Sequence, residues 1–149
     1  MNPIIRNILA VILGLGIGGF VNMSLINVGY SVTPIPGFDP TDPEAMETLA
    51  TVYKNLDFKF YVFPFLAHAV GTLVGAIVAG LIAANHKMKF ATAIGCVFLL
   101  GGIMVNFMIA GPVWFIAADI ILAYIPMGWL GGKIALKFMK DSPSANEMN

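Results

Sequence analysis

Four long apolar runs constrain the fold of this chain more than any other feature of its sequence. The hydrocarbon core of a bilayer is about 30 Å thick, so a helix needs roughly 20 apolar residues to cross it. Each run has about this length, far longer than a buried β-strand of roughly 5 to 6 residues. The sequence therefore predicts an all-α fold, a bundle of four transmembrane helices. The expected spans are residues 8–28, 62–84, 90–110 and 113–132.

The composition supports this prediction and excludes other classes of protein. Of the 149 residues, 58% are hydrophobic and 11% are charged, whereas a soluble domain carries about 25% charged residues. This balance excludes a soluble globular domain and a disordered chain. Basic and acidic residues number 8 each, so the sequence offers no basic surface for binding nucleic acid. The single cysteine, Cys96, lies inside an apolar run, where we expect it to contribute to packing.

The links between the spans and the placement of the basic residues predict the topology. Very short links, residues 85–89 and 111–112, join the last three spans and force neighbouring helices to run antiparallel. With both termini inside the cell, most basic residues fall on the cytoplasmic side, as the positive-inside rule requires. We therefore expect a multi-pass protein with cytoplasmic termini and a cytoplasmic tail at residues 133–149. The basic residues inside are Arg6, Lys87, Lys89, Lys133, Lys137 and Lys140, and those outside are Lys54 and Lys59.

The one long connection, residues 29–61, is predicted to lie outside the membrane and to contain a helix. Asp42 suits the N-cap position and Pro43 the first turn of a helix. Apolar residues then recur every three or four positions, which predicts a single apolar stripe along an amphipathic helix. This external helix is expected to lie on the outer membrane surface or to cap the bundle, or else to dock a partner. The stripe consists of Met46, Leu49, Tyr53, Leu56 and Phe60.

Small residues at helical spacing predict close contacts between the spans. Helices in lipid associate through close backbone packing and hydrogen bonds, because the surrounding acyl chains are as apolar as the helices. We expect the glycines to pack within one chain, although the same pattern also serves packing between chains. Pro126 leaves the carbonyl of Leu122 without its helical partner, which predicts a kink in the fourth span. The helix-packing glycines are Gly14, Gly18, Gly71, Gly75, Gly128 and Gly132.

A few polar side chains fall inside the spans at similar depths. Asp119 is the only acidic residue in any span, and a charged aspartate there costs on the order of 3 kcal/mol, so it should face a partner. At about 1.5 Å per residue, Asp119 and His68 lie about 10 Å and about 9 Å from the outer ends of their helices. The imidazole is therefore the expected partner of the carboxylate. The predicted intramembrane polar layer contains His68, Asp119, Asn22 and Asn106, with Tyr124 about one turn below.

Two interpretations of this polar layer stay open. In the first, His68 and Asp119 form a buried hydrogen-bonded pair, and the two asparagines link helices. In the second, the pair is a proton relay or the floor of an outward-facing substrate cavity, because ionisable groups within a membrane commonly serve function. The sequence contains no zinc-protease, serine-hydrolase or phosphate-binding motif. It therefore predicts no catalytic residue, no metal site and no cofactor.

Two stretches of the sequence resemble a known group of proteins. Residues 65–76 read FLAHAVGTLVGA, and Trp114-Phe115 is followed by Asp119 and by AYIPMGWLGGK at residues 123–133. With a similarity over most of the chain, these motifs resemble small bacterial four-span membrane proteins with no assigned activity. The resemblance implies a protein of the bacterial inner membrane and implies nothing about a substrate.

Three functions are compatible with these features. The first is a non-catalytic accessory subunit or oligomer-forming component of a membrane complex, which the lack of motifs and the small-residue faces favour. The second is a small transporter or channel that uses the His68–Asp119 pair. The third is a lipid- or quinone-modifying membrane enzyme, for which the spans offer only one acid and one histidine. The expected partners are the lipid bilayer and another membrane protein or a second copy of the chain, without nucleic acid.

Overall fold

The computed structural model describes residues 1–141, which form helices joined by loops and contain no β-strand. Four helical segments are long and apolar enough to cross a membrane, and the fourth is made of two shorter helices. The predicted all-α fold with four such segments is therefore confirmed. The elements are α1 (Pro3–Val32), α2 (Ala45–Val52), the 3-10 helix η1 (Tyr53–Asn55), α3 (Lys59–Ile82), α4 (Lys87–Met108), α5 (Val113–Leu122) and α6 (Ile125–Lys140).

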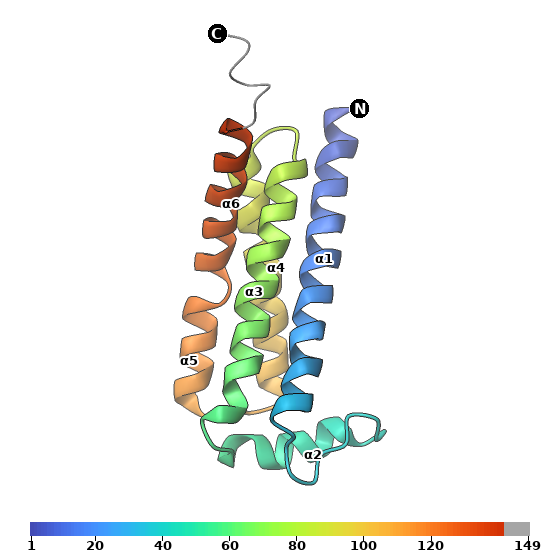
Figure 1. Cartoon of the computed structure of the whole chain (residues 1–149), viewed down its shortest axis with the longest axis vertical. Coiled ribbons are helices and arrows are strands. Elements are labelled where there is room, and N and C mark those ends of the chain that lie inside the picture. The colour runs from blue at the N-terminus through green and yellow to red at the C-terminus, as the bar shows by residue number, and fades with distance from the viewer. Residues whose placement is uncertain (142–149) are drawn as a thin grey trace.

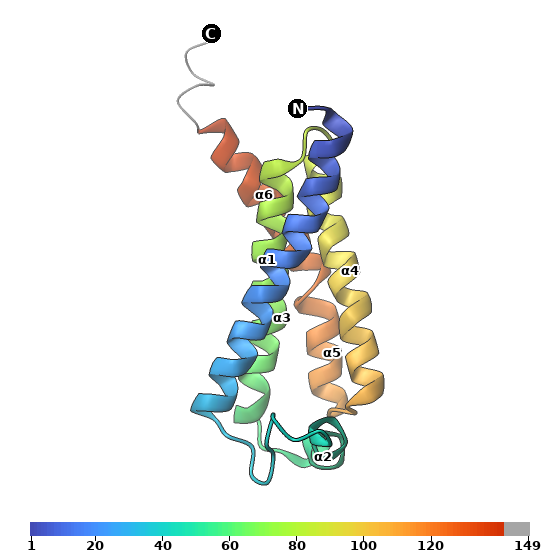
Figure 2. The same cartoon turned by 90° about the vertical axis from the view of Figure 1, so that its right-hand side faces the viewer.

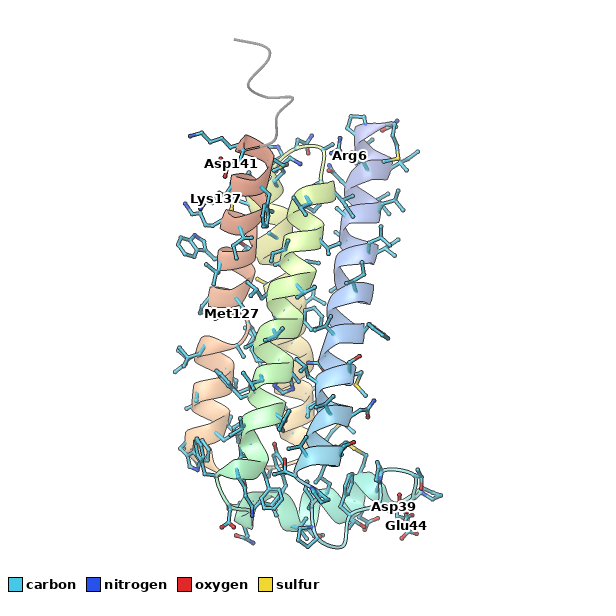
Figure 3. The ribbon with its side chains drawn as sticks, viewed as in Figure 1. Arg6, Asp39, Glu44, Met127, Lys137 and Asp141 are labelled. Carbon is cyan, nitrogen blue, oxygen red and sulfur yellow. The ribbon has the colours of Figure 1, made fainter. Side chains whose placement is uncertain are left out.

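The long helices stand side by side, with α3 in the middle of the bundle. Of the four apolar segments, α3 is the most buried, and it contacts α1, α4 and α6. The beginning of α1 and the end of α6 lie at one end of the bundle, whereas α2 lies across the opposite end (Figure 1). We call these the terminal end and the α2 end. Arg6, Lys137 and Asp141 lie at the terminal end, and Asp39 and Glu44 lie at the α2 end (Figure 3).

The fourth apolar segment is broken in its middle, between α5 and α6. The amide of Ala123 donates to the carbonyl of Asp119 at 2.9 Å, and the amide of Gly128 donates to the carbonyl of Tyr124 at 2.8 Å. The first bond is the last of α5, and the second is the first of α6. Pro126 lies in the first turn of α6, where its missing N–H costs no helical bond. The predicted kink is thus a complete break, and Figure 2 shows α6 leaving α5 in a different direction.

The last helix extends beyond the fourth expected span, and one expected packing role differs from the structure. The span is expected to end at Gly132, and α6 continues to Lys140, with lysines in its last turn that complement the helix dipole. The first half of the predicted tail is therefore helical, and residues 142–149 of that tail lie outside the described residues. Cys96 is exposed on α4 and does not pack in the core.

The helix between α1 and α3 is shorter than the sequence predicts. Asp42 accepts a hydrogen bond from the amide of Glu44 at 2.9 Å in a preceding turn, and α2 itself begins at Ala45. The chain becomes extended at Leu56, so Phe60 belongs to α3 and not to the predicted stripe. The three-to-four spacing of apolar residues continues from the connection into α3, because α3 is apolar on nearly all of its faces and so fits an apolar stripe in any register.

Aromatic contacts fix η1 to the α2 end of the bundle. Leu49 and Tyr53 are buried, whereas Met46 of the same predicted stripe is exposed. The ring of Tyr53 packs edge-on against Tyr61 of α3 at 5.0 Å and against Phe115 of α5 at 6.1 Å between ring centroids. The Tyr61 hydroxyl donates to the Tyr53 carbonyl. Leu56 is partly buried against the same cluster, so Leu49, Tyr53 and Leu56 of the stripe cover the bundle end, whereas Met46 does not.

Glycines let the backbones of α1 and α3 touch. A Cβ on Gly18 would lie 2.7 Å from the carbonyl oxygen of Gly71, and a Cβ on Gly75 would lie 2.6 Å from that of Gly14. These distances are shorter than van der Waals contact, so a larger residue fits only if a helix moves. The two predicted packing glycines of α6, which lie against α4, are Gly128 and Gly132.

Candidate functional site

Three polar side chains from separate elements meet inside the bundle. The Nδ1 atom of His68 in α3 lies 2.8 Å from Oδ1 and 3.0 Å from Oδ2 of Asp119 in α5. The hydroxyl of Tyr124, at the break between α5 and α6, donates to Oδ2 of Asp119 at 2.8 Å and lies 2.9 Å from Nδ1 of His68. We call this set the polar triad. His68 and Asp119, which we expect to pair because they lie at similar depths, are thus in contact, and Tyr124 contacts both of them.

These contacts determine where the protons lie when Asp119 is ionised. A carboxylate only accepts hydrogen bonds, so Nδ1 of His68 carries a hydrogen and donates a hydrogen bond to Asp119. The Tyr124 hydroxyl is the second donor to the same carboxylate. In a neutral imidazole the other ring nitrogen, Nε2, then has a lone pair. Within residues 1–141 the hydrogen bonds of His68 all involve Nδ1, so this lone pair is available to a ligand.

The triad lies at the inner wall of a cavity near the α2 end. Asp119 is fully buried and Tyr124 nearly so, whereas the His68 side chain keeps 17% of its surface exposed. The cavity has a volume of about 120 Å³, and His68 is the triad member that lines it. A molecule in the cavity therefore reaches the carboxylate only through the imidazole. The other lining residues with polar side-chain atoms are Tyr30, Thr33, Tyr53 and Asn106.

The break in the fourth segment and a glycine of α4 place the Tyr124 hydroxyl. The backbone of Tyr124, with φ −116° and ψ −77°, stays in the right-handed helical region but departs from the dihedral angles of a regular helix. A Cβ on Gly102 would lie only 2.1 Å from the Tyr124 hydroxyl oxygen. Gly102 is therefore required for this hydroxyl to reach the triad. Sequence reasoning missed Gly102, because no local pattern indicates which distant side chain a glycine accommodates.

The two asparagines of the predicted polar layer do not join the triad. Asn106 lines the cavity, but its Nδ2 atom donates to the carbonyl of Gly102 in its own helix at 2.9 Å. Asn22 packs against Gly71, and in the described part of the chain its side chain makes no hydrogen bond to another helix. Equal depth is therefore not sufficient for contact, because each helix must also turn its side chain toward the others.

Two further observations concern the chemistry around the triad. Among residues 1–141, no group of three or more histidine, cysteine, aspartate or glutamate side chains is arranged to hold a metal ion. Thr72, one turn beyond His68 on α3, has a fully buried hydroxyl with no hydrogen-bond partner in the same range. A buried hydroxyl without a partner thus lies one turn from the triad on the same helix.

Tyr124→Phe is expected to destabilise the folded chain by about 2 kcal/mol, because the buried carboxylate of Asp119 loses one of its two donors. The phenyl ring retains the packing of the tyrosine. Thermal unfolding in detergent measures the effect, with Tyr30→Phe as control, because the Tyr30 hydroxyl makes no hydrogen bond within the described residues. Equal stability of the two variants would contradict the bond between Tyr124 and Asp119.

Comparison with known proteins assigns no function to the polar triad. No family model, no curated protein and no solved structure matches the chain. The bacterial origin suggested by the sequence resemblance therefore stays a prediction.

Proposed function

We propose that the chain is an integral protein of the bacterial inner membrane, with its terminal end in the cytoplasm. The four apolar helical segments support this proposal. Large apolar side chains on the outside of the bundle, such as Phe20 at 74% exposed and Phe107 at 87% exposed, suit contact with acyl chains. Basic side chains gather at the terminal end, Arg6 and Lys137 among them, as the positive-inside rule requires of a cytoplasmic side (Figure 3).

Within this membrane protein, the polar triad is best explained as the proton-binding group of a small transporter or channel. One observation carries the proposal: His68 lines the cavity while the buried carboxylate of Asp119 holds its Nδ1 atom. A purely structural pair gains nothing from an open cavity, because water competes for its hydrogen bonds. The broken fourth segment supports the same function, since discontinuous helices commonly form the binding sites of transporters.

The geometry lets His68 take up and release a proton. A proton from the cavity binds Nε2, and the negative charge of Asp119, 2.8 Å from Nδ1, stabilises the imidazolium that forms. The Tyr124 hydroxyl keeps the carboxylate in place while the imidazole changes its charge. The unpartnered hydroxyl of Thr72, about 6 Å further along α3, extends the route toward the terminal end.

Proton flux into proteoliposomes tests this function. A potassium gradient with valinomycin drives protons, and a trapped pH-sensitive dye reports their arrival. The unaltered chain should conduct well above empty vesicles, and His68→Gln should reduce the rate to that of empty vesicles, because glutamine does not titrate near neutral pH. His86→Gln is the matched control, since His86 lies at the terminal end before α4. Wild-type flux in His68→Gln, or none in the unaltered chain, would refute the proposal.

A second candidate function is the non-catalytic accessory subunit or oligomer-forming component. A different observation favours it: a Cβ on Gly16 or Gly101 would meet nothing within 4 Å. These glycines leave room for a helix of another membrane protein, or of a second copy, to approach the backbone closely. Copurification in mild detergent tests this proposal, and a solitary monomer would count heavily against it.

A further inference from the structure

The cavity beside His68 has apolar walls in which five aromatic rings alternate with aliphatic side chains. Tyr30 comes from α1, Tyr53 from η1 and Phe115 from α5, and Phe60 and Phe63 come from α3. An apolar cavity of about 150 Å³ holds one benzene molecule, so the smaller volume of about 120 Å³ suits a ligand smaller than benzene, such as a short-chain molecule. Aromatic rings also attract cations through the partial negative charge of their faces. The walls therefore favour a small ligand with an apolar body and a positive charge.

The inner end of the cavity presents hydrogen-bond acceptors in front of a buried negative charge. The Nδ2 atom of Asn106 donates to the carbonyl of its own helix, which leaves Oδ1 as the free acceptor. Neutral His68 presents the lone pair of Nε2, and the fully buried carboxylate of Asp119 lies behind it. No lysine or arginine of the described residues lines the cavity. While His68 is neutral, the charge of Asp119 therefore lacks a counter-ion.

The chain segment at the same end of the bundle is acidic. It connects α1 to α3 and lies at the α2 end (Figure 1), and some of its residues, Leu49 and Tyr53 among them, line the cavity. Hydrogen bonds from the backbone and the hydroxyl of Thr41 lower the pKa of the Asp39 carboxyl and keep it ionised. A negative surface raises the local concentration of cations. The acidic residues of this segment are Asp39, Asp42, Glu44, Glu47 and Asp57, and the basic ones are Lys54 and Lys59.

We propose that the cavity binds a small organic ammonium ion, and that this ion and a proton on His68 exclude each other. The ammonium N–H groups donate to Nε2 of His68 and Oδ1 of Asn106, and the apolar part of the ion contacts the aromatic walls. The charge of the ion balances that of Asp119. This inference rests on the proposed function, because it names the substrate class of the same site.

The mutual exclusion follows from the groups around His68. Phenol and carboxyl groups carry no positive charge in either protonation state, so among these groups the imidazole is the one that can replace the ammonium ion as a cation. A proton on Nε2 balances the carboxylate and removes the lone pair, so an ammonium ion then loses both its counter-charge and its acceptor. On the α4 side the cavity presents Asn106, which does not titrate. The titratable side chains that contact His68 or line the same cavity are Asp119, Tyr124, Tyr30 and Tyr53.

Isothermal titration calorimetry on the purified full chain in mild detergent tests the proposal. The probes are butylamine, which is protonated at neutral pH, and 1-butanol, its neutral counterpart of the same size. At a pH of about 8, we expect butylammonium to bind at least about tenfold more tightly than 1-butanol, because it alone balances the buried charge. Its affinity should fall as the pH is lowered, because a proton on His68 competes with the ion. Equal affinities of the two probes, or an affinity that does not change with pH, would overturn the proposal.

Variants connect this preference to the named side chains. Asp119→Asn should abolish the preference for butylammonium, whereas the matched control Asp141→Asn, at the terminal end, should retain it. His68→Gln should bind butylammonium without the pH dependence, because glutamine offers an acceptor that does not titrate. A preference that survives in Asp119→Asn would overturn the proposal.

The proton-flux experiment contains no amine, so the two proposals fail separately. A chain that conducts protons but shows no saturable binding of butylammonium would overturn the ammonium site and leave the proposed function intact. A chain that binds butylammonium with the expected pH dependence but conducts no protons would overturn the proposed function and leave the ammonium site intact.

Discussion

Asp119→Asn is expected to reduce proton flux at least about a hundredfold while leaving the stability of the folded chain within about 1 kcal/mol. Asparagine has the same shape, and its Oδ1 atom still accepts from Nδ1 of His68. It lacks the charge that stabilises the imidazolium. Two unit charges about 4 Å apart interact by about 4 kcal/mol at an effective dielectric constant of about 20. Losing this interaction therefore lowers the equilibrium constant for protonation of His68 more than about a hundredfold. Proteoliposome flux and thermal unfolding in detergent measure the two effects.

Stability distinguishes loss of charge from loss of packing in this experiment. Removing a carboxylate from a buried ion pair leaves no stranded charge, because His68 can stay neutral. Asp119→Ala, by contrast, leaves both the imidazole and the Tyr124 hydroxyl without an acceptor and should cost about 3 kcal/mol or more. If Asp119→Asn lost stability but kept its flux, the pair would be structural. If neither quantity changed, both interpretations of the pair would fail.

The pairing of His68 with Asp119 was predictable because two physical requirements converge on it. A lone carboxylate within a membrane span needs a partner, and the rise of about 1.5 Å per residue placed one imidazole at its level. Tyr124 was expected about a turn below this level. The break between α5 and α6 changes that register and places its hydroxyl 2.8 Å from the carboxylate.

Features that depend on the rotation of a helix were not predictable from depth. Asn22 and Asn106 lie on the expected helices, but one packs against a glycine and the other bonds its own helix. A small error in helix rotation moves a side chain from the interior to the surface. The cavity could not be predicted from the sequence either, because its walls combine residues of α1, α3, α4 and α5 with Leu49 and Tyr53 from the connecting segment.

Gly18→Leu is expected to detach α1 from α3, with a loss of about 3 kcal/mol or more in the free energy of folding. Even a Cβ at this position would lie 2.7 Å from the carbonyl oxygen of Gly71 and 3.0 Å from the Cα of Gly75. Backbone atoms cannot rotate away as a side chain does, so the whole helix must move. Total stabilities of about 5–15 kcal/mol make such a loss a large fraction of the whole.

Gly19→Leu is the matched control for this substitution, because it adds the same side chain to the next residue of the same helix. A Cβ on Gly19 meets nothing within 4 Å, so the leucine should extend outward without cost. Helical content is a poor readout here, since α1 remains a helix in detergent after it detaches. The temperature at which the protein loses its monodisperse elution peak reports tertiary packing instead. Equal temperatures for Gly18→Leu and Gly19→Leu would mean that the contact between α1 and α3 does not hold the bundle together.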